Sequence, residues 1–239
     1  MPEEGVALVP RREVLSFEEI ERVARAAAGL GVTRLRVTGG EPLVRRDIEV
    51  LVGMLARIRG VTDLSMTTNG LLLSVFAEKL AEAGLMRVNV SLDATDPDRY
   101  RAVTRGGDVR KVMEGIAAAR KAGLAPVKLN CVVENGSEEP DARDVAEYAR
   151  REGLEVRYIR RMDLGSGRFY GVEGGKGGRC SECNRLRLTC NGFVRPCLFS
   201  DIAFSVRELG AEEALRRAVE SKPRTGGRSS LASIGLVGG

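Results

Sequence analysis

Short runs of β-branched and apolar residues alternate along the chain with longer amphipathic segments, and this alternation constrains the fold most. A strand pattern followed by a helical period, repeated at intervals of roughly 25 to 40 residues, is typical of a parallel α/β protein. Five strands are predicted, over residues 33–38, 62–67, 86–91, 127–133 and 155–160. Five helices are predicted, over residues 17–30, 48–58, 74–82, 109–121 and 142–151.

The first predicted helix has no strand before it. Ser16 and Glu19 have the spacing of a capping box at its start, and Gly31 is placed to end it. Polar motifs follow nearly every strand, which favours a barrel, where strand ends meet at one mouth, over an open sheet. We therefore expect a parallel partial TIM-type barrel, a (β/α)6-like fold that lacks its first strand, with a small cysteine-bearing C-terminal segment.

Three regions are expected along the chain. Residues 1–163 form the partial barrel, 164–179 form a glycine-rich linker or gap, and 180–239 form a C-terminal segment. The linker has no apolar period that suits a core. The last region contains an amphipathic stretch over 206–219 and closes with Gly238-Gly239.

Composition excludes several classes of function. The 239 residues include no histidine, which excludes His bases and His-ligated metals. Neither a membrane span nor a secretion signal is visible, so we expect a cytoplasmic protein whose five cysteines indicate a metal site rather than disulfides. The net charge of +5 suits an anionic ligand, whereas 4% aromatic residues and no Trp argue against binding nucleic acid by base stacking.

Polar groups at the strand ends are candidates for chemistry. Gly39 and Gly40 let the backbone approach a ligand, and Glu41 is able to hold an ammonium group, although a tight turn before Pro42 explains the same residues. The other candidates at strand ends are Thr67, Asn89, Ser91, Asp93, Lys128, Asn130 and Met162. Each has a structural alternative: a turn at Thr67, a helix cap at Asp93, a solvated edge at Lys128 and core filling at Met162.

The cysteine segment carries the most specific pattern. Cys180, Cys183 and Cys197 have the spacing C-x2-C-x13-C, with Cys190 between the last two. Four thiolates would close a structural zinc site, and three would leave one iron of a [4Fe–4S] cluster open, and the spacing alone leaves both alternatives. Arg185 and Arg187 lie beside these cysteines, where guanidinium groups suit a phosphate or a purine edge.

Several motifs together resemble the molybdenum cofactor biosynthesis protein A (MoaA) family, the radical S-adenosylmethionine (SAM) GTP 3′,8-cyclases. They occur in that family's order and cover most of the chain. The matching stretches are Arg36-Val-Thr-Gly-Gly-Glu-Pro-Leu-Val-Arg-Arg-Asp47, Thr67-Thr-Asn-Gly70, Asn89-Val-Ser-Leu-Asp93, Val127-Lys-Leu-Asn130, Cys180-x2-Cys-Asn-Arg-Leu-Arg187 and Arg195-Pro-Cys-Leu-Phe199.

The resemblance implies a six-strand partial barrel with two [4Fe–4S] clusters. One cluster would cleave SAM to a 5′-deoxyadenosyl radical, which abstracts the ribose C3′ hydrogen of GTP so that C3′ joins purine C8, giving (8S)-3′,8-cyclo-7,8-dihydroguanosine 5′-triphosphate. The second would anchor the guanine. The product would pass to the synthase that makes cyclic pyranopterin monophosphate, and a homodimer is compatible with the resemblance.

The resemblance also implies roles for particular residues. SAM would contact Gly39, Gly40, Glu41, Ser91 and Met162. GTP would contact Arg36, Thr67, Lys128, Arg185 and Arg187. The distal cluster would be held by Cys180, Cys183 and Cys197, which favours iron–sulfur over zinc, while Gly238 and Gly239 match a tail that reaches the active site.

Two departures from the family pattern define further expectations. The family's C-x3-C-x2-C motif near the N-terminus is not in this sequence, and several dozen residues before Cys180 are replaced by the glycine-rich stretch. We expect that the sequence belongs to a longer chain whose mass exceeds 25.8 kDa by several kilodaltons. The alternatives are a truncated, non-catalytic nucleotide-binding paralogue and a zinc-stapled, Arg-rich nucleic-acid-binding module.

Overall fold

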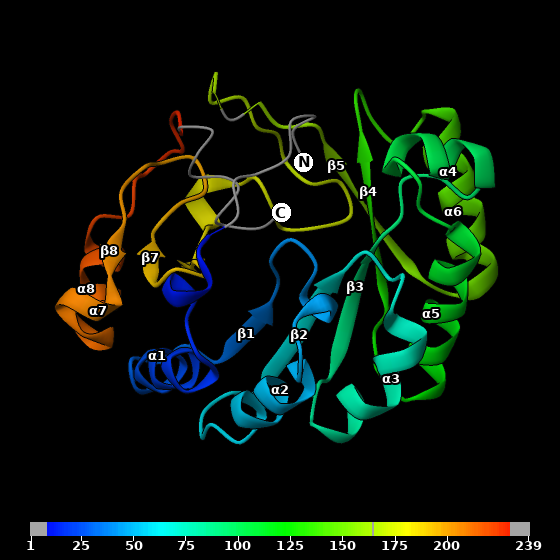
Figure 1. Ribbon diagram of the computed structural model, residues 1–239. Helices are drawn as coiled ribbons and strands as arrows, with labels where there is room; N and C mark the ends of the chain where they lie inside the picture. Colours follow the sequence, from blue (N-terminus) through cyan, green and yellow to red (C-terminus); the bar gives the residue numbers. More distant parts are fainter. Residues whose placement is uncertain (1–8, 164, 230–239) are drawn as a thin grey trace.

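A parallel five-stranded sheet organises the chain in a computed structural model that describes residues 9–163 and 165–229 (Figure 1). The strand order is β1-β2-β3-β4-β5, so each strand pairs with its neighbours in sequence. This confirms the predicted parallel α/β partial barrel. The strands are β1 (Arg34–Val37), β2 (Asp63–Thr68), β3 (Arg87–Ser91), β4 (Lys128–Val133) and β5 (Glu155–Arg160).

Helices connect the strands and cover the outer face of the sheet (Figure 1). They are α1 (Phe17–Gly29), α2 (Ile48–Ala56), α3 (Leu73–Glu82), α4 (Pro97–Thr104), α5 (Val109–Lys121) and α6 (Pro140–Glu152). The predicted helices are confirmed to within two residues at most ends. The structure also contains α4, which was not predicted; this short polar helix begins after its cap Asp96 and buries only Tyr100.

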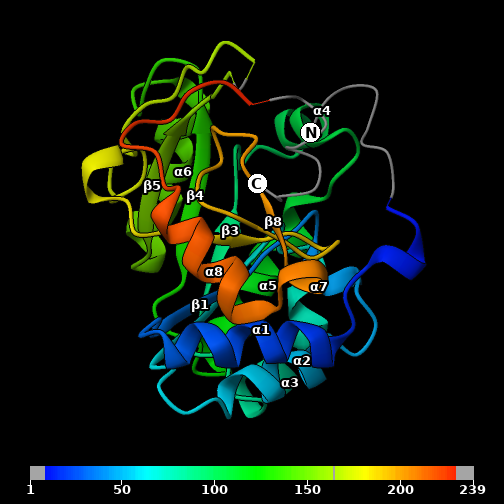
Figure 2. The ribbon, with the colours of Figure 1, turned by 90° about the vertical axis from the view of Figure 1, so that its left-hand side faces the viewer.

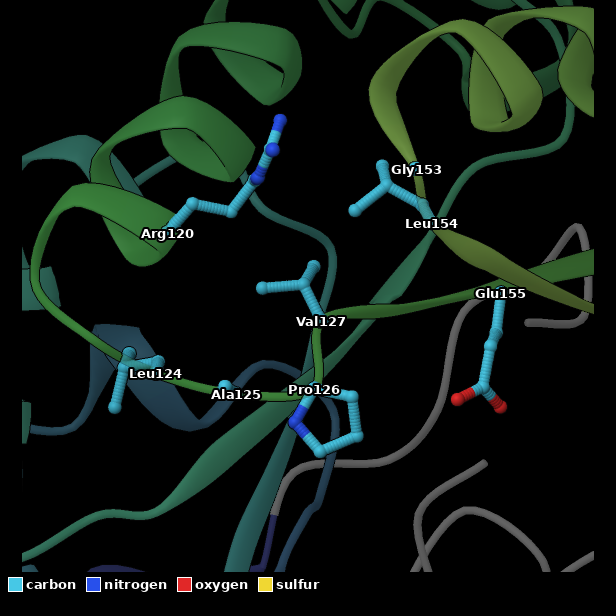
Figure 3. Close-up of a pocket in the computed structure, with 8 residues that line it drawn as sticks. All are labelled: Arg120, Leu124, Ala125, Pro126, Val127, Gly153, Leu154 and Glu155. Carbon is cyan, nitrogen blue, oxygen red and sulfur yellow. The ribbon is translucent and has the colours of Figure 1, made fainter.

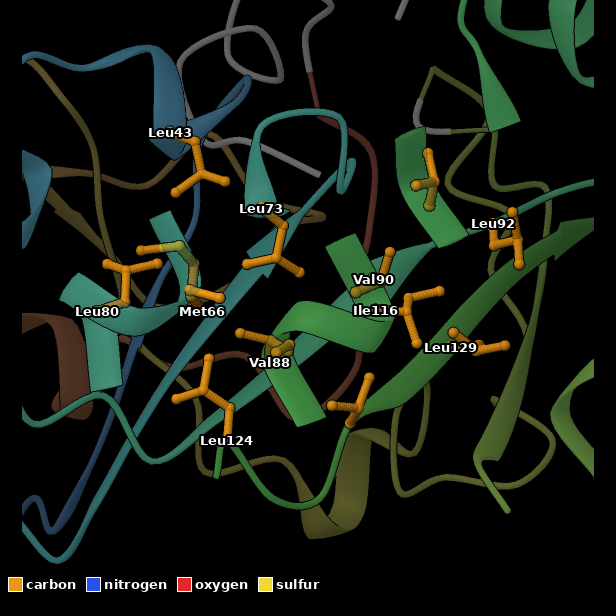
Figure 4. Packing of buried hydrophobic residues seen from close by; sticks show 14 of the residues in the cluster. Leu43, Met66, Leu73, Leu80, Val88, Val90, Leu92, Ile116, Leu124 and Leu129 are labelled. Atoms are coloured by element: carbon orange, nitrogen blue, oxygen red, sulfur yellow. The ribbon is translucent and has the colours of Figure 1, made fainter. Parts of the chain in front are cut away.

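The two faces of the sheet differ in chemistry. Successive residues of a strand point to opposite faces, so Val88 and Val90 of β3 pack into the helix-covered core while Asn89 points the other way. Figure 4 shows the core between the sheet and the helices, with Met66, Val88 and Leu129 facing Leu80 and Ile116. We call the side of the sheet opposite the helices the inner face; its side chains are Arg34, Arg36, Asp63, Ser65, Thr67, Arg87, Asn89, Ser91, Lys128, Asn130, Glu155 and Arg157.

The C-terminal segment folds as a second small layer beside α1. Three short antiparallel strands, β6 (Arg187–Leu188), β7 (Phe193–Arg195) and β8 (Phe204–Ser205), are followed by α7 (Val206–Leu209) and α8 (Ala211–Glu220). Figure 2 shows α8 lying along α1. Val23 and Ala27 of α1 share a separate apolar cluster with Val194 and Leu215, so α1 joins the two layers. The predicted amphipathic stretch 206–219 is interrupted at Gly210.

The glycine-rich segment borders the free edge of β5. Tyr158 and Glu173 exchange backbone hydrogen bonds of 3.0 and 3.1 Å, and Asp163 pairs in the same way with Arg168. Gly178 makes a close approach possible, because a Cβ at this position would meet the Tyr170 carbonyl oxygen at 1.9 Å. From β5 the chain then crosses to the β1 side of the sheet, where the cysteine segment lies (Figure 1). The domain boundaries themselves stay a prediction.

The helices of residues 9–163 and 165–229 fall short of the combination of length and apolarity that a membrane span requires. None of them is long and apolar enough to cross a bilayer.

The capping box at α1 is confirmed and is extended by α7. Ser16 and Glu19 exchange hydrogen bonds of 2.8 and 3.2 Å, and the Glu19 carboxylate also accepts two hydrogen bonds from Arg207, at 2.9 and 3.1 Å. The Arg207 guanidinium, with the backbone at Ser16, lowers the pKa of Glu19 from 4.5 to about 2. Because the folded pKa is depressed, this stabilisation is complete above pH 4.5 and is lost as the pH falls toward 2.

We expect Glu19→Gln to lower the stability at pH 7 and to flatten its decline between pH 4.5 and 2. Urea unfolding at a series of pH values measures both effects. Glu21→Gln is the matched control, because Glu21 pairs only within α1, with Arg25 at 2.5 Å. An acid decline in Glu19→Gln as steep as in the wild type would contradict the assignment.

Candidate functional site

Register across the sheet brings the predicted polar side chains into rows on the inner face. Arg36 of β1 lies beside Ser65 of β2, and Ser65 lies beside Arg87 of β3. One level further along, Thr67, Asn89 and Lys128 form a second row. Neighbours in register on parallel strands point to the same side of a sheet. Arg36, Thr67 and Lys128, predicted from three separate motifs, are therefore brought together on one surface.

Three guanidinium groups of this face, those of Arg36, Arg87 and Arg157, lie near one another and near Arg185 of the cysteine segment. The pKa of Arg36, which keeps part of its surface exposed, is lowered to about 10, mainly because its guanidinium is buried and also because Arg87, Arg157 and Arg185 lie near it. Burial, and then Arg87, lower the pKa of Arg157 in the same way. The buried Nε of Arg157 has no hydrogen-bond partner within the described ranges. Clustered, partly desolvated cations of this kind are a binding surface for an anion.

Two carboxylates modify the cationic surface. Asp63 accepts two hydrogen bonds from Arg87, at 2.9 and 2.7 Å, in the paired geometry that guanidinium and carboxylate groups prefer. The Arg87 guanidinium lowers the pKa of Asp63. Lys128 forms an ion pair with Glu155, its neighbour in register on β5. Arg87 is thus held in position, and Lys128 is already paired in the ligand-free chain.

Glu41 ties the first two strand ends together. Its carboxylate accepts hydrogen bonds from the Leu43 backbone, at 3.1 Å, and from the Thr68 hydroxyl, at 2.7 Å. It also accepts one from the Asn69 N–H, at 2.6 Å. Of the two proposed roles of Glu41, the structure thus displays the structural one. Before it, Gly39 adopts a φ of +157°, and a Cβ on Gly40 would meet no atom within 4 Å, so this loop offers exposed backbone.

The remaining predicted SAM contacts also lie at carboxyl ends. Ser91 closes β3, and Met162 follows β5 with 38% of its surface exposed, so it does not fill the core. Met162 instead lines a hollow of about 240 Å³ with Glu134, Arg168 and Tyr170. Asp93 does not cap a helix: its carboxylate accepts a hydrogen bond of 2.8 Å from the Val132 N–H, and burial raises its pKa.

The cysteine segment lies around Arg187. Cys180 opens a short 3-10 helix, η3 (Cys180–Glu182), and backbone N–H groups point at two sulfurs: Gly226 donates to Cys180 Sγ at 3.5 Å, and Phe199 donates to Cys197 Sγ at 3.4 Å. Burial and Arg185 lower the pKa of Arg187, and the thiols of Cys183 and Cys197 partly offset this. Arg187 therefore lies near two of the predicted ligands, Cys183 and Cys197. Arg185, which is near both Arg187 and Arg36, connects this segment to the arginines of the inner face.

The thiols do not form a closed ligand set. Among residues 9–163 and 165–229, no three Cys, Asp or Glu side chains are arranged to hold a metal ion. The donor type fits iron–sulfur or zinc, since thiolates bind both and backbone N–H groups already solvate two sulfurs. The convergence of Cys180, Cys183 and Cys197 on one centre stays a prediction.

Cys190 is separated from the other three cysteines by the β6–β7 hairpin. It lies in the turn, where its carbonyl accepts a hydrogen bond of 2.7 Å from Leu15 and its thiol lies near Arg45. Arg187 pairs with Arg195 at the opposite end of the hairpin, and Cys197 lies beyond it. Three extended residues span about 10 Å, whereas two thiolates on one ion lie about 4 Å apart. This geometry disfavours the four-cysteine zinc site.

Lys222 links the two backbone segments that carry the predicted ligands. Its amine donates to the carbonyl of Arg185 at 2.7 Å and to the carbonyl of Pro196 at 2.6 Å. Those carbonyls lie two residues after Cys183 and one residue before Cys197. A single side chain therefore fixes the spacing between the two segments.

We expect Lys222→Met to weaken metal retention by about 10-fold, as the loss of a group that supports metal ligands typically does. Metal content after reconstitution and dialysis against a chelator measures this. Lys121→Met, at the exposed end of α5, is the control. Equal metal retention in the two variants would show that Lys222 does not position the ligands.

A second hollow lies at the other end of the sheet. It has a volume of about 250 Å³ and is lined by Arg120, Pro126, Val127 and Leu154, among others (Figure 3). These residues precede β4 and β5 or end α5, so the hollow is at the amino ends of the strands, away from the strand ends and cysteines. No predicted site residue lines it, and it is not the candidate site.

Comparison with known proteins defines the class first. The model of the radical SAM superfamily matches residues 6–149, and the chain belongs to that superfamily. Solved structures share the fold at low identity: SuiB of Streptococcus suis bound to S-adenosylmethionine covers 93% of this chain and 64% of its own, with TM-score 0.57 and 13% identity. Methylornithine synthase (PylB) covers 61% of this chain and 44% of its own, with TM-score 0.52 and 18% identity.

Sequence relatives define the particular family. The GTP 3′,8-cyclase of Moorella thermoacetica is 40% identical over 276 residues, covering 93% of this chain and 85% of the relative. That of Geobacter sulfurreducens is 35% identical over 282 residues, covering 96% and 86%. The chain belongs to the GTP 3′,8-cyclase family. Because the aligned spans exceed the 239 residues of this chain, the relatives carry segments that it lacks.

Sequence reasoning missed some residues of the candidate site and left others outside the structure. Arg87, Arg157 and Lys222 were not predicted; alternation along β3 and β5 could have indicated the first two, but frequent arginine obscured it. Gly238 and Gly239 lie outside the described residues.

Proposed function

We propose that the chain binds GTP on the inner face of the partial barrel and acts in its 3′,8-cyclisation, an early step of molybdenum cofactor biosynthesis. The observation that carries this is the cluster of Arg36, Arg87 and Arg157 on the inner face, with Arg185 near them, in a chain from the GTP 3′,8-cyclase family. Guanidinium groups hold phosphate oxygens through paired, charge-assisted hydrogen bonds. The triphosphate is therefore assigned to this cluster, with Lys128 released from Glu155 to join it.

The carboxyl ends of the strands are assigned to SAM. Gly39, Gly40, Ser91 and Met162 follow or close β1, β3 and β5, so they share one edge of the sheet. Exposed backbone at the two glycines suits the amino acid part of SAM. Glu41 then supports this loop through its hydrogen bonds to the end of β2 rather than binding the ammonium group directly.

The guanine end is assigned to the cysteine segment. Cys180, Cys183 and Cys197 would hold a [4Fe–4S] cluster, which supplies one iron with a coordination position open to the base. Arg185 and Arg187 connect this segment to the phosphate-binding arginines. In this arrangement the protein fixes both ends of one nucleotide and holds its ribose between them, which is what a reaction at the ribose and the purine requires.

Radical SAM proteins as a class use a further [4Fe–4S] cluster to cleave SAM. No cysteine precedes Cys131 in this sequence, so the residues present do not supply that cluster's ligands. The contribution assigned to this chain is therefore the binding and orientation of the two substrates.

A nucleotide series tests the proposed function. Calorimetric titration of the iron-reconstituted full chain measures its affinity for GTP, GDP and GMP. The affinity should fall roughly 10-fold with each phosphate removed, because each phosphate contributes charge-assisted hydrogen bonds. ATP should bind at least about 10-fold more weakly than GTP, because it lacks the guanine edge. Equal affinities for GTP and GMP would contradict the arginine site, and equal affinities for GTP and ATP would contradict the guanine site.

The setting of the reaction is proposed with it. We assign the protein to the cytoplasm and its product to the enzyme that makes cyclic pyranopterin monophosphate. Co-purification with that enzyme tests whether the product is transferred directly between the two proteins. Light scattering tests for a homodimer.

A further inference from the structure

Asn89 is a buried amide without a hydrogen-bond partner. Its exposed fraction is 0%, and neither Oδ1 nor Nδ2 is bonded to any residue in the part of the chain that the structure describes. Ser65, in the neighbouring strand, shows the usual situation: it is 1% exposed and donates to the Leu35 carbonyl while accepting from Arg36 Nε. A buried amide left unpaired costs the folded chain stability, so its presence requires a reason.

The side chain of Asn89 points to the substrate side of the sheet. Val88 and Val90, its neighbours on β3, are both 0% exposed and pack into the helix-covered core. Alternation along the strand then puts Asn89 on the inner face, in one row with Thr67 and Lys128. Its unpaired amide therefore faces the side of the sheet to which the nucleotide is assigned.

The position of Asn89 along β3 indicates which part of the nucleotide it meets. Arg87, two residues earlier, belongs to the phosphate-binding cluster, and Ser91, two residues later, closes the strand at the SAM edge. Each step of two residues spans about 6.7 Å. Along β3, Asn89 therefore lies between Arg87 of the arginine cluster and the SAM edge, where the sugar of a nucleotide would lie.

The hydrogen-bonding capacity of the Asn89 amide also indicates that it meets the ribose. A phosphate only accepts hydrogen bonds, so it would leave Asn89 Oδ1 unpaired. A ribose hydroxyl both donates and accepts, and a vicinal pair can satisfy Oδ1 and Nδ2 together.

We propose that the Asn89 amide binds the ribose hydroxyls of the nucleotide and selects ribonucleotides over deoxyribonucleotides. This rests on the proposed GTP site. In the ligand-free chain the amide is held unpaired by its packing, and substrate binding pairs both of its atoms. Asn89 is then a binding and specificity residue, which lowers the stability of the free chain and raises its affinity for GTP.

Asn89→Leu tests the proposal, since leucine has a similar volume and no polar atom. We expect the melting temperature of the ligand-free variant to equal or exceed that of the wild type, because two unpaired polar atoms are removed. Affinity for GTP should fall roughly 10- to 100-fold, while affinity for 2′-deoxyGTP and 3′-deoxyGTP should change much less. Thermal unfolding and calorimetry on the iron-reconstituted full chain measure these quantities.

Asn89→Ala is a second variant, which adds no bulk. If the leucine variant does not fold, the preference for GTP over the two deoxynucleotides is measured on Asn89→Ala. A lower melting temperature together with an unchanged preference for GTP over both deoxynucleotides would show that Asn89 is structural and would overturn the proposal. ITP, which lacks the guanine amino group, should lose affinity equally in wild type and variants; a loss confined to wild type would assign Asn89 to the base instead. Failure of wild type to bind GTP would overturn the proposed function itself.

Discussion

Cys197→Ser is expected to reduce the iron bound after anaerobic reconstitution from about four per chain to less than one, whereas Cys190→Ser is expected to retain it. Cys197 lies beside Arg187 with its sulfur accepting a backbone hydrogen bond, in the segment where the ligands are predicted. Cys190 lies in the turn at the other end of the β6–β7 hairpin. Iron and sulfide analysis, with zinc measured on the same samples, gives the result.

The pair of variants separates the two metal alternatives. Both change one sulfur to oxygen in the same C-terminal segment, so the comparison isolates ligation from folding. If both variants lose the metal and the wild type holds one zinc, the four-cysteine zinc site is correct and the iron–sulfur assignment is wrong.

Arg187→Ala is expected to weaken GTP binding by roughly 10- to 100-fold, which corresponds to about 1.5–3 kcal/mol for hydrogen bonds to a charged group. Arg187 is half-buried near Arg185 and the thiols of Cys183 and Cys197, so it connects the arginine cluster to the guanine end. Its loss removes a cation from the least hydrated part of the site, where charge is most effective. Calorimetric titration at two salt concentrations measures the affinity.

Arg143→Ala is the matched control. Arg143 lies on α6, where it pairs with Glu138 at 2.9 Å, and its side chain is 66% exposed. Its removal changes the net charge equally but should leave GTP affinity within about twofold, because surface charges are screened by salt. GTP binding that survives Arg187→Ala unchanged would contradict the assigned role.

Strand and helix positions were predictable where one period persists. The alternating valines of β3 and the capping box at α1 mark their elements through local chemistry, and both are confirmed. Two parts lacked such a signal: α4 buries only Tyr100, so no apolar stripe marks it, and β6 to β8 have two or three residues each, too few for an alternation. Those strands form because their apolar residues pack on α1, a contact that local sequence does not encode.

The candidate site was predictable as a set of motifs but not as a surface. The motifs gave Arg36, Thr67 and Lys128, and strand register then placed them on one face. Spacing alone could not show that Cys190 lies apart from Cys180, Cys183 and Cys197, because the 13 residues between Cys183 and Cys197 can form an open loop or a hairpin. The pairing of Arg187 with Arg195 shows that they form a hairpin. The unpaired amide of Asn89 is a property of packing, and sequence alone identified only its face.

An anaerobic crystal structure of the iron-reconstituted full chain with GTP tests the central claim most directly. The expected density shows phosphate oxygens within hydrogen-bond distance of Arg36, Arg157 or Arg185, and an iron–sulfur cluster on Cys180, Cys183 and Cys197 facing the guanine. Nucleotide bound away from the inner face, or three thiols bound to separate centres, would contradict it.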